Sequence, residues 1–187
     1  MRALVGVGGG IAAYKAAELA RALTERGVEV QVVMTAAAQQ FVRPLTFAAL
    51  TGRKVITDLF PTAGHEETLS SAVEHIGVAQ ESDVLVVAPA TADLMAKFAH
   101  GLADDFLSTL YLAFTGPVVL APAMNTNMWA NPAVQNNVAT MKERGFKFIG
   151  PAEGRLACGT EGPGRMSEPQ DILDAIEKIA SKIKKPE

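Results

Sequence analysis

Short apolar runs rich in β-branched residues alternate with segments of helical periodicity along this 187-residue chain. Such strand–helix repeats favour a parallel sheet, because each crossover helix packs back onto the sheet through a right-handed connection. The pattern predicts an α/β fold, a three-layer sandwich with a Rossmann-like (flavodoxin-like) parallel sheet and helices on both faces. The expected strands are residues 2–7, 28–34, 83–89, 117–122 and 146–150, with a short one at 55–56.

The helices expected between these strands have recognisable ends. A glycine after the last periodic residue, as at Gly27 and Gly52, commonly ends a helix. Ser167 followed by Gln170 is a capping-box pattern, which predicts the start of a final helix. The expected helices are residues 11–26, 43–52, 93–101, 104–114, 129–144 and 167–182, and residues 61–71 are expected to form a polar loop.

The composition fits one globular domain spanning residues 1–187. Hydrophobic residues make up 49% of the chain and charged residues 20%, values typical of soluble proteins. The net charge of −3 gives no electrostatic reason to expect a nucleic acid or an anionic membrane as partner, and no apolar run approaches a membrane span of ~20 residues. Residues 1–8 resemble a strand and not a signal peptide, and the single cysteine, Cys158, favours a reducing cytoplasm.

Ligands of open parallel sheets bind beyond the carboxyl ends of the strands. Three segments occupy such positions here: Gly8–Gly10, the sequence APATAD at 88–93, and APAMNTNMW at 121–129. In the third segment, Asn125 offers one hydrogen-bond acceptor and two donors. It therefore either contacts a ligand or caps a helix.

The glycine-rich turn has more than one interpretation. Gly8, Gly10 and Ala13 fit the G-x-G-x-x-A fingerprint of dinucleotide sites, which is a weak signal alone. A nicotinamide dinucleotide also needs an acidic residue at the end of the second strand to hold its ribose, and Thr35 stands there instead. The free N–H groups and the dipole of the following helix still favour an anion. The alternative is a turn that only packs the helix against the sheet.

Six motifs follow one another along the chain: GGIAAYK, VMTAAAQQFV, EHIGVA, APATADLMAK, PAMNTNMW and ACGTEGPGRM. In this set and order the chain resembles the flavin-dependent cysteine decarboxylases, and within them the phosphopantothenoylcysteine decarboxylases of bacterial coenzyme A biosynthesis. The resemblance covers about residues 2–180 and implies FMN, a mononucleotide, as cofactor. The residues implied to bind it are Gly9, Gly10, Ile11, Thr35, Phe41, Pro89, Thr91, Ala92, Asp93 and Ala123.

One position departs from the family pattern. Family members commonly carry Ser or Thr where this chain has Gly8. A hydroxyl contact to the FMN phosphate is therefore expected to be absent, which leaves backbone N–H groups and Thr91. On this reasoning, Gly8→Ser restores a donor and tightens FMN binding by ~1.5–3 kcal/mol at most.

The reaction implied by the resemblance is decarboxylation of 4′-phosphopantothenoylcysteine to 4′-phosphopantetheine. A cysteine carboxylate does not lose carbon dioxide directly, because the carbanion left behind has no electron sink. Oxidation of the thiol carbon to a thioaldehyde supplies that sink, and decarboxylation then leaves an enethiolate. Return of a hydride and addition of a proton complete a redox-neutral reaction.

The resemblance also implies three catalytic residues. His75 would orient the substrate or assist proton removal, Asn125 would bind the leaving carboxylate, and Cys158 would protonate the enethiolate. A thiol suits this last role because its ordinary pKa of about 8.5 lets it donate a proton near neutral pH. The scattered histidines and the single cysteine show no metal-binding spacing, so no metal is expected.

The glycine-rich segment 151–166 is expected to be a mobile flap over the active site, because its glycines can act as hinges. Arg165 in this segment could meet the substrate phosphate, and Met124 is expected beside the substrate together with Asn125. The family further implies a homotrimer or a dodecamer with the flavin at a subunit boundary. It also implies a phosphopantothenate–cysteine ligase as partner, either fused or separate.

Two other functions stay open at this point. A decarboxylase of peptidyl C-terminal cysteine shares the asparagine motif, so only substrate tests distinguish it from a phosphopantothenoylcysteine decarboxylase. A flavin-binding regulatory subunit of a phosphatase can lose the cysteine or the asparagine, and both are present here. The flavin prenyltransferases lack both motifs and are disfavoured.

Overall fold

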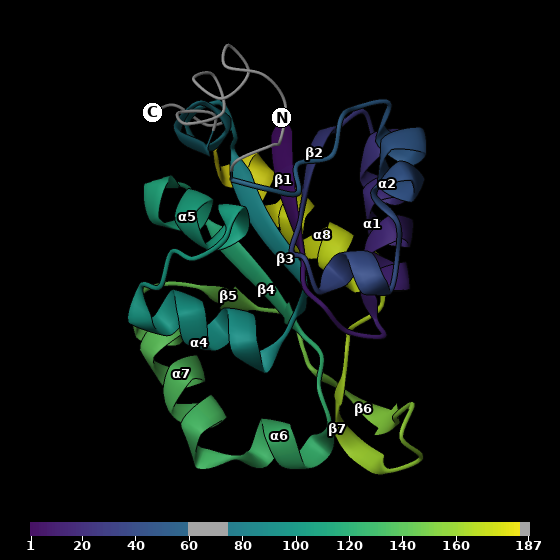
Figure 1. Ribbon diagram of the computed structural model, residues 1–187, viewed down its shortest axis with the longest axis vertical. Helices are drawn as coiled ribbons and strands as arrows, with labels where there is room; N and C mark the ends of the chain where they lie inside the picture. The colour runs from purple at the N-terminus through teal and green to yellow at the C-terminus, as the bar shows by residue number, and fades with distance from the viewer. Residues whose placement is uncertain (60–74, 184–187) are drawn as a thin grey trace.

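Five parallel strands form one sheet in the order β2-β1-β3-β4-β5 (Figure 1). The computed structural model describes residues 1–59 and 75–183, so the loop predicted at 61–71 lies outside the described residues. The strands are β1 Arg2–Val7, β2 Glu29–Met34, β3 Val84–Ala90, β4 Val118–Pro122 and β5 Lys147–Phe148. This order is that of flavodoxin-like folds, in which the strand order reverses between β1 and β3 and leaves a crevice at their carboxyl ends.

Helices cover both faces of the sheet. One face lies under α1 and α8, with α2 beside α1, and the other lies under α4, α5 and α7 (Figure 1). The longer helices are α1 Ala13–Glu25, α2 Pro44–Thr51, α4 Ala92–His100, α5 Phe106–Ala113, α7 Pro132–Glu143 and α8 Pro169–Ile183. The predicted three-layer α/β sandwich is confirmed.

Alternate side chains of each central strand enter two separate apolar cores. In β1, Val5 and Val7 belong to the core under α1 and α8, whereas Leu4 belongs to the core under α4 and α5. In β3, Val86 and Val87 divide in the same way. Successive side chains of a strand point to opposite faces, so a strand buried on both faces has a continuous apolar sequence. This is why the strands could be predicted from apolar runs.

The helix predicted over 129–144 is in fact two helices. A short one, α6 (Thr126–Ala130), precedes α7, and Asn131 between them has an extended backbone with φ −63° and ψ 131°. Pro132 is the cause, because proline lacks an N–H group and disfavours a helical conformation in the residue before it. The break lets Asn125 cap a helix of its own at the end of β4.

The predicted start of the final helix was also displaced. α8 begins at Pro169, and the carbonyl of Glu168 accepts hydrogen bonds from the N–H groups of Asp171 and Ile172. Ser167 is buried just before the helix. Proline is well tolerated in the first helical turn, so Pro169 marks the start better than the serine does.

The segment 151–166, which was expected to be a mobile flap, contains a two-stranded antiparallel hairpin. Its strands are β6 Ala152–Arg155 and β7 Glu161–Arg165. The N–H group of Met124 donates to the carbonyl of Gly164 (2.9 Å), and a Cβ at Gly164 would overlap the carbonyl of Met124. Strand β7 is therefore docked on the segment that follows β4. The mobility of the segment stays a prediction.

Two smaller features depart from the predicted strands. Strand β3 continues through Pro89 to Ala90, and its register with β4 shifts between Val87 and Ala90. Ile56 forms a single bridge to Val33 where a short strand was expected. Among the residues that the structure describes, the helices are all too short or too polar to cross a membrane.

Candidate active site

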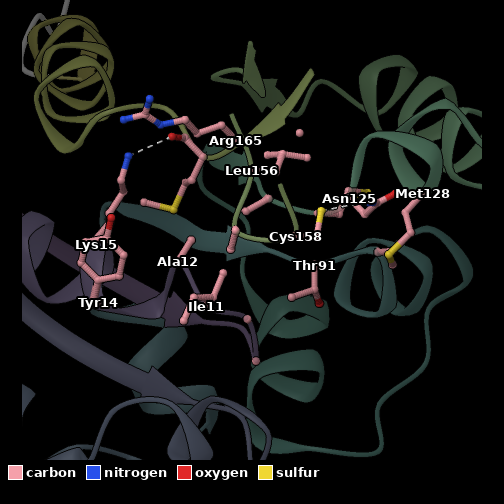
Figure 2. A pocket seen from close by; sticks show the side chains of 18 of the residues that line it. Ile11, Ala12, Tyr14, Lys15, Thr91, Asn125, Met128, Leu156, Cys158 and Arg165 are labelled. Atoms are coloured by element: carbon pink, nitrogen blue, oxygen red, sulfur yellow. Dashed lines mark hydrogen bonds between the residues drawn. The ribbon is translucent and has the colours of Figure 1, made fainter. Parts of the chain in front are cut away.

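A pocket of about 450 Å³ opens beyond the carboxyl ends of β1, β3 and β4, with the β6–β7 hairpin as its outer wall (Figure 2). Most of its lining is apolar. Figure 2 shows Lys15 and Arg165 toward one end, Asn125 and Met128 toward the other, and Leu156 and Cys158 from the hairpin between them. Of the residues predicted to form a site, the pocket brings together Gly9, Gly10, Ile11, Thr91, Ala92, Ala123, Met124, Asn125, Cys158 and Arg165.

The turn between β1 and α1 presents unpaired backbone donors to this pocket. Within the described parts of the chain, the N–H groups of Gly9, Ile11 and Ala12 have no hydrogen-bond partner, and no side chain caps the helix. A Cβ at Gly10 would meet no atom closer than 3.9 Å, so Gly10 borders open space. Free N–H groups at the positive end of a helix dipole favour an anionic group there.

Gly8 and Gly9 are required by packing. A Cβ at Gly8 would overlap the carbonyl oxygen of Pro89, and a Cβ at Gly9 would overlap the side chain of Ala37. Pro89 and Ala37 can stay this close to the turn only if residues 8 and 9 are both glycine. The predicted gain in FMN binding from Gly8→Ser therefore does not follow, because a serine is admitted only after one of the backbones moves.

Thr91 borders the pocket from the end of β3. Its Oγ1 accepts a hydrogen bond from the N–H of Leu94 (3.2 Å) as the N-cap of α4, which leaves the hydroxyl proton available to a ligand. Asp93, in the first turn of α4, does not line the pocket. Its carboxylate is exposed and lies 3.7 Å from Nζ of Lys97.

Asn125 and Cys158, which are 33 residues apart in sequence, are in direct contact. Oδ1 of Asn125 accepts from the N–H of Asn127 (2.8 Å), and Nδ2 donates to Sγ of Cys158 (3.3 Å). Oγ1 of Thr160 lies 3.1 Å from the same sulfur. Hydrogen bonds from the Thr160 hydroxyl, from the Thr160 N–H and from Asn125 lower the pKa of Cys158 to about 7. The thiol and thiolate forms therefore coexist near neutral pH.

The other end of the pocket is cationic. Lys15 is only 5% exposed, and its Nζ donates to Oε1 of Glu168 (2.9 Å) and to the carbonyl of Met166 (3.3 Å). Arg165 donates to the same carboxylate oxygen (2.7 Å). The hydrogen bond from Lys15, and then the charges of Lys15 and Arg165, hold the pKa of Glu168 below its usual value. Arg155 also lines the pocket and has no ion-pair partner among the described residues.

Several predicted site residues lie outside the pocket lining as described. Thr35 is buried, where its Oγ1 accepts from the N–H of Ala38 (3.1 Å), and half of Phe41 is exposed. Pro89 lies within β3. His75 packs edge-on against Phe106, with ring centroids 6.4 Å apart, and its buried Nδ1 has no partner in the described structure.

Lys15, Arg155 and Tyr14 line the pocket although the sequence analysis did not single them out. For Lys15 a signal existed, because Lys15, Leu19 and Leu23 recur at four-residue spacing and lie on the buried face of α1. Within residues 1–59 and 75–183, no group of three or more His, Cys, Asp or Glu side chains is arranged to hold a metal ion.

Comparison with known proteins gives consistent matches over most of the chain. It is 48% identical over 176 residues to the coenzyme A biosynthesis bifunctional protein CoaBC of Vibrio vulnificus, which covers 94% of this chain and 43% of the relative. The chain thus spans less than half the length of that relative.

Two solved structures have the same fold. A PPC decarboxylase mutant complexed with pantothenoylaminoethenethiol is 32% identical with a TM-score of 0.84, and the match covers 96% of this chain and 98% of that one. The FMN-dependent cysteine decarboxylase SpaF is 36% identical with a TM-score of 0.79, covering 96% and 97%. The FMN dependence of SpaF agrees with a flavin as the class of cofactor for this pocket. The model of the Flavoprotein family matches residues 1–181, and the chain belongs to that family.

Proposed function

We propose that this chain is an FMN-dependent decarboxylase that converts 4′-phosphopantothenoylcysteine to 4′-phosphopantetheine in coenzyme A biosynthesis. The observation that carries the proposal is the contact of Asn125 with Cys158 inside a pocket whose opposite wall offers unpaired N–H groups. The CoaBC relatives and the PPC decarboxylase structure support the same reaction.

The residues present fit FMN. The unpaired N–H groups of Gly9, Ile11 and Ala12, together with the Thr91 hydroxyl, would hold its phosphate or ring oxygens, and Gly10 leaves room for close approach. When bound, FMN supplies reversible hydride transfer, which allows the thiol carbon to be oxidised and later reduced.

Asn125 and Cys158 would act at the cysteine end of the substrate. The Nδ2 group of Asn125 has two N–H bonds, so it can bind the substrate carboxylate while one bond stays directed at Cys158. After loss of carbon dioxide, Cys158 would donate its proton to the enethiolate. Its pKa of about 7 keeps part of the thiol protonated at neutral pH and leaves a stabilised thiolate after transfer.

The cationic end of the pocket favours a phosphorylated substrate over a peptidyl cysteine. Lys15 and Arg165 carry two positive charges there and Glu168 carries one negative charge, and Arg155 adds a positive charge to the pocket lining, although the whole chain has a net charge of −3. A substrate with a carboxylate at one end and a phosphate at the other matches the two ends of the pocket. A peptide with a C-terminal cysteine offers no such second anion.

We propose further that the enzyme is a homotrimer or a multiple of a trimer in which His75 acts at the site of a neighbouring subunit. Among the described residues, His75 does not line the pocket, and its buried Nδ1 has no hydrogen-bond partner there. Exposed apolar side chains gather where α1 begins and around α2, which suits a subunit contact; they are Ile11, Tyr14, Phe41 and Leu45.

The shared site can be tested by complementation. His75→Asn and Cys158→Ser variants should each form almost no 4′-phosphopantetheine, and mixed trimers should regain its formation because some sites then combine an intact His75 with an intact Cys158. Mass spectrometry of intact complexes verifies that subunits have exchanged. Exchanged but inactive mixtures would show that both residues must come from one chain, and a fully active monomer would exclude the trimer.

The reaction itself is tested by product analysis with Cys158→Ser. Purified wild type should carry FMN and convert 4′-phosphopantothenoylcysteine to 4′-phosphopantetheine. The serine variant should still release carbon dioxide but stop at an enethiol two hydrogens lighter than the normal product, since a serine hydroxyl is too weak an acid. Normal product at the wild-type rate from Cys158→Ser would remove Cys158 from the mechanism, and absence of flavin binding would remove the whole proposal.

The length of the relatives suggests a partner. Because the chain spans 43% of CoaBC, we propose that a phosphopantothenate–cysteine ligase, fused or separate, supplies the substrate. Cytoplasmic location follows from this pathway as a further part of the proposal. Assay with and without the ligase, starting from phosphopantothenate and cysteine, tests whether the two activities work in sequence.

A further inference from the structure

The tip of the hairpin presents Cys158 in a closed turn. The N–H of Leu156 donates to the carbonyl of Thr160 (2.8 Å), and the N–H of Gly159 donates to the carbonyl of Leu156 (2.9 Å). Gly159 has φ +85°, a conformation that few residues other than glycine adopt readily. The turn brings the chain back on itself, so the side chain of Thr160 lies beside the sulfur of Cys158.

Two elements supply polar groups to this sulfur. Oγ1 of Thr160 lies 3.1 Å from Sγ within the tip, and Nδ2 of Asn125 lies 3.3 Å from it at the start of α6. The charged groups that line the surrounding pocket are Arg155 and Arg165 on the hairpin and Lys15 on α1. The groups that hydrogen-bond the sulfur, namely the Thr160 hydroxyl, the Thr160 N–H and the Asn125 amide, are uncharged, so hydrogen bonds and not an ion pair set its environment.

The two side chains in contact with the sulfur differ in their freedom to rotate. Asn125 is held by its own capping hydrogen bond to the N–H of Asn127 (2.8 Å), so its amide donates in one fixed direction. The hydroxyl of Thr160 can rotate, accepting a hydrogen bond from the thiol or donating one to the thiolate. It can therefore follow the loss of the proton from Cys158.

We propose that Thr160 is a positioning residue that sets the acidity of Cys158 through its hydroxyl group. In the step concerned, the S–H bond of Cys158 breaks and a C–H bond forms at the carbon that has lost carbon dioxide. The enethiolate becomes a thioaldehyde again, and Cys158 keeps the electron pair as a thiolate. The Thr160 hydroxyl donates to that thiolate, and solvent later returns the proton.

The proposal concerns the same site as the proposed function, but its first test does not depend on that function. Cys158 is the only cysteine of the chain, so alkylation by iodoacetamide followed by intact mass spectrometry reports this thiol alone. The pH at which alkylation reaches half its maximal rate should be near 7 in the wild type. Thr160→Val should raise this midpoint by about one pH unit, because a donor to a charged sulfur is lost.

Three comparison variants make the result specific. Thr160→Ser keeps the hydroxyl and should keep the wild-type midpoint, whereas Thr160→Ala should behave as Thr160→Val does. Thr140→Val removes a threonine hydroxyl on α7 that bonds the carbonyl of Asn136 (3.0 Å), and it should leave the midpoint unchanged. Thermal melting of each variant confirms that it is folded.

Product analysis extends the test to catalysis. With 4′-phosphopantothenoylcysteine, Thr160→Val should release the enethiol product in a larger share than the wild type does, and Thr160→Ser should not. An unchanged alkylation midpoint in Thr160→Val, or an equal shift in Thr160→Ser, would overturn the proposal. Alkylation midpoints that shift as expected in a protein that decarboxylates nothing would support the role of Thr160 and reject the proposed function.

Discussion

The two walls of the pocket are built in different ways. The wall at the end of the sheet is formed by backbone atoms, because the β1–α1 turn offers its N–H groups to the pocket. Gly8 and Gly9 in this turn are packed so closely that a Cβ does not fit. The hairpin wall is formed by side chains, since Cys158 and Arg165 lie exposed on a short two-stranded ribbon. A fixed backbone suits a cofactor that stays bound, whereas exposed side chains suit a substrate that enters and a proton that moves.

If the side chains around Cys158 supply the chemistry, the largest effect should come from Asn125→Asp, at the start of α6. An aspartate still accepts the hydrogen bond from Asn127, but its charge repels the substrate carboxylate. We expect decarboxylation to fall by about 100-fold, from a repulsion of a few kcal/mol between partly solvated charges. A steady-state assay of released carbon dioxide measures the rate of decarboxylation in the variant and in the wild type.

A matched control separates charge at the site from loss of a helix cap. Asn131 caps α7 in the same way, with Oδ1 accepting from the N–H of Ala133 (2.9 Å), and it does not line the pocket. Asn131→Asp should keep normal activity. An active Asn125→Asp enzyme would show that Asn125 is a helix cap and nothing more.

The backbone wall can be tested by comparing two glycines. Gly9→Ala forces a methyl group into Ala37 and should lower the free energy of unfolding by ~1–3 kcal/mol and weaken FMN binding. Gly159→Ala, where no atom lies within 4 Å of the added Cβ but φ is +85°, should cost ~1 kcal/mol and leave FMN binding unchanged. Thermal melting and flavin titration compare them, and equal loss of flavin in both would remove the contrast between the walls.

The pH dependence should differ between the two stages of the reaction. Cys158 must be protonated to act as an acid, and its pKa is about 7, so formation of 4′-phosphopantetheine should fall above that pH by about tenfold per unit. Release of carbon dioxide should not fall with it, because that stage does not use the thiol proton. Separate measurement of the two products from pH 6 to 9 checks this, and parallel declines would place the titrating group elsewhere.

The smallest effect is expected from Arg155, a cation of the pocket lining that has no ion-pair partner among the described residues. Arg155→Ala should raise KM for 4′-phosphopantothenoylcysteine about fivefold, since an exposed charge pair contributes about 1 kcal/mol at most. The substrate without phosphate should be unaffected. Arg21→Ala, which removes an exposed arginine paired with Glu25 on α1, serves as the control. Equal KM changes for both substrates would show that Arg155 does not face the phosphate.

The layered fold was predictable because its strands are buried on both faces and read as apolar runs. The hairpin was not predictable, because its strands contain Gly154, Gly162 and Gly164 and show no apolar alternation. Glycine is also depleted in strands generally. Its pairing depends on docking against Met124, a contact distant in sequence. Local sequence patterns carry no information about such contacts.

The candidate site was predictable in part. Residues of the glycine turn and the Asn125 and Cys158 motifs were found through motif resemblance, but their mutual contact came only from the fold. Lys15 was missed because buried lysines are rare, although its spacing with Leu19 placed it on the buried face. The placement of His75 outside its own pocket depends on tertiary structure, which a motif does not describe.

The way the hairpin is attached bears on how this fold can change over evolutionary time. Its base is held by the Gly164–Met124 hydrogen bond and by the Lys15–Glu168 pair, while residues 156–160 at the tip make their own closing hydrogen bonds. The tip is therefore a cassette that can be exchanged without rebuilding the domain. Grafting tips of other sequence and length onto these same anchors offers a direct route to new substrate selectivity and to new proton donors.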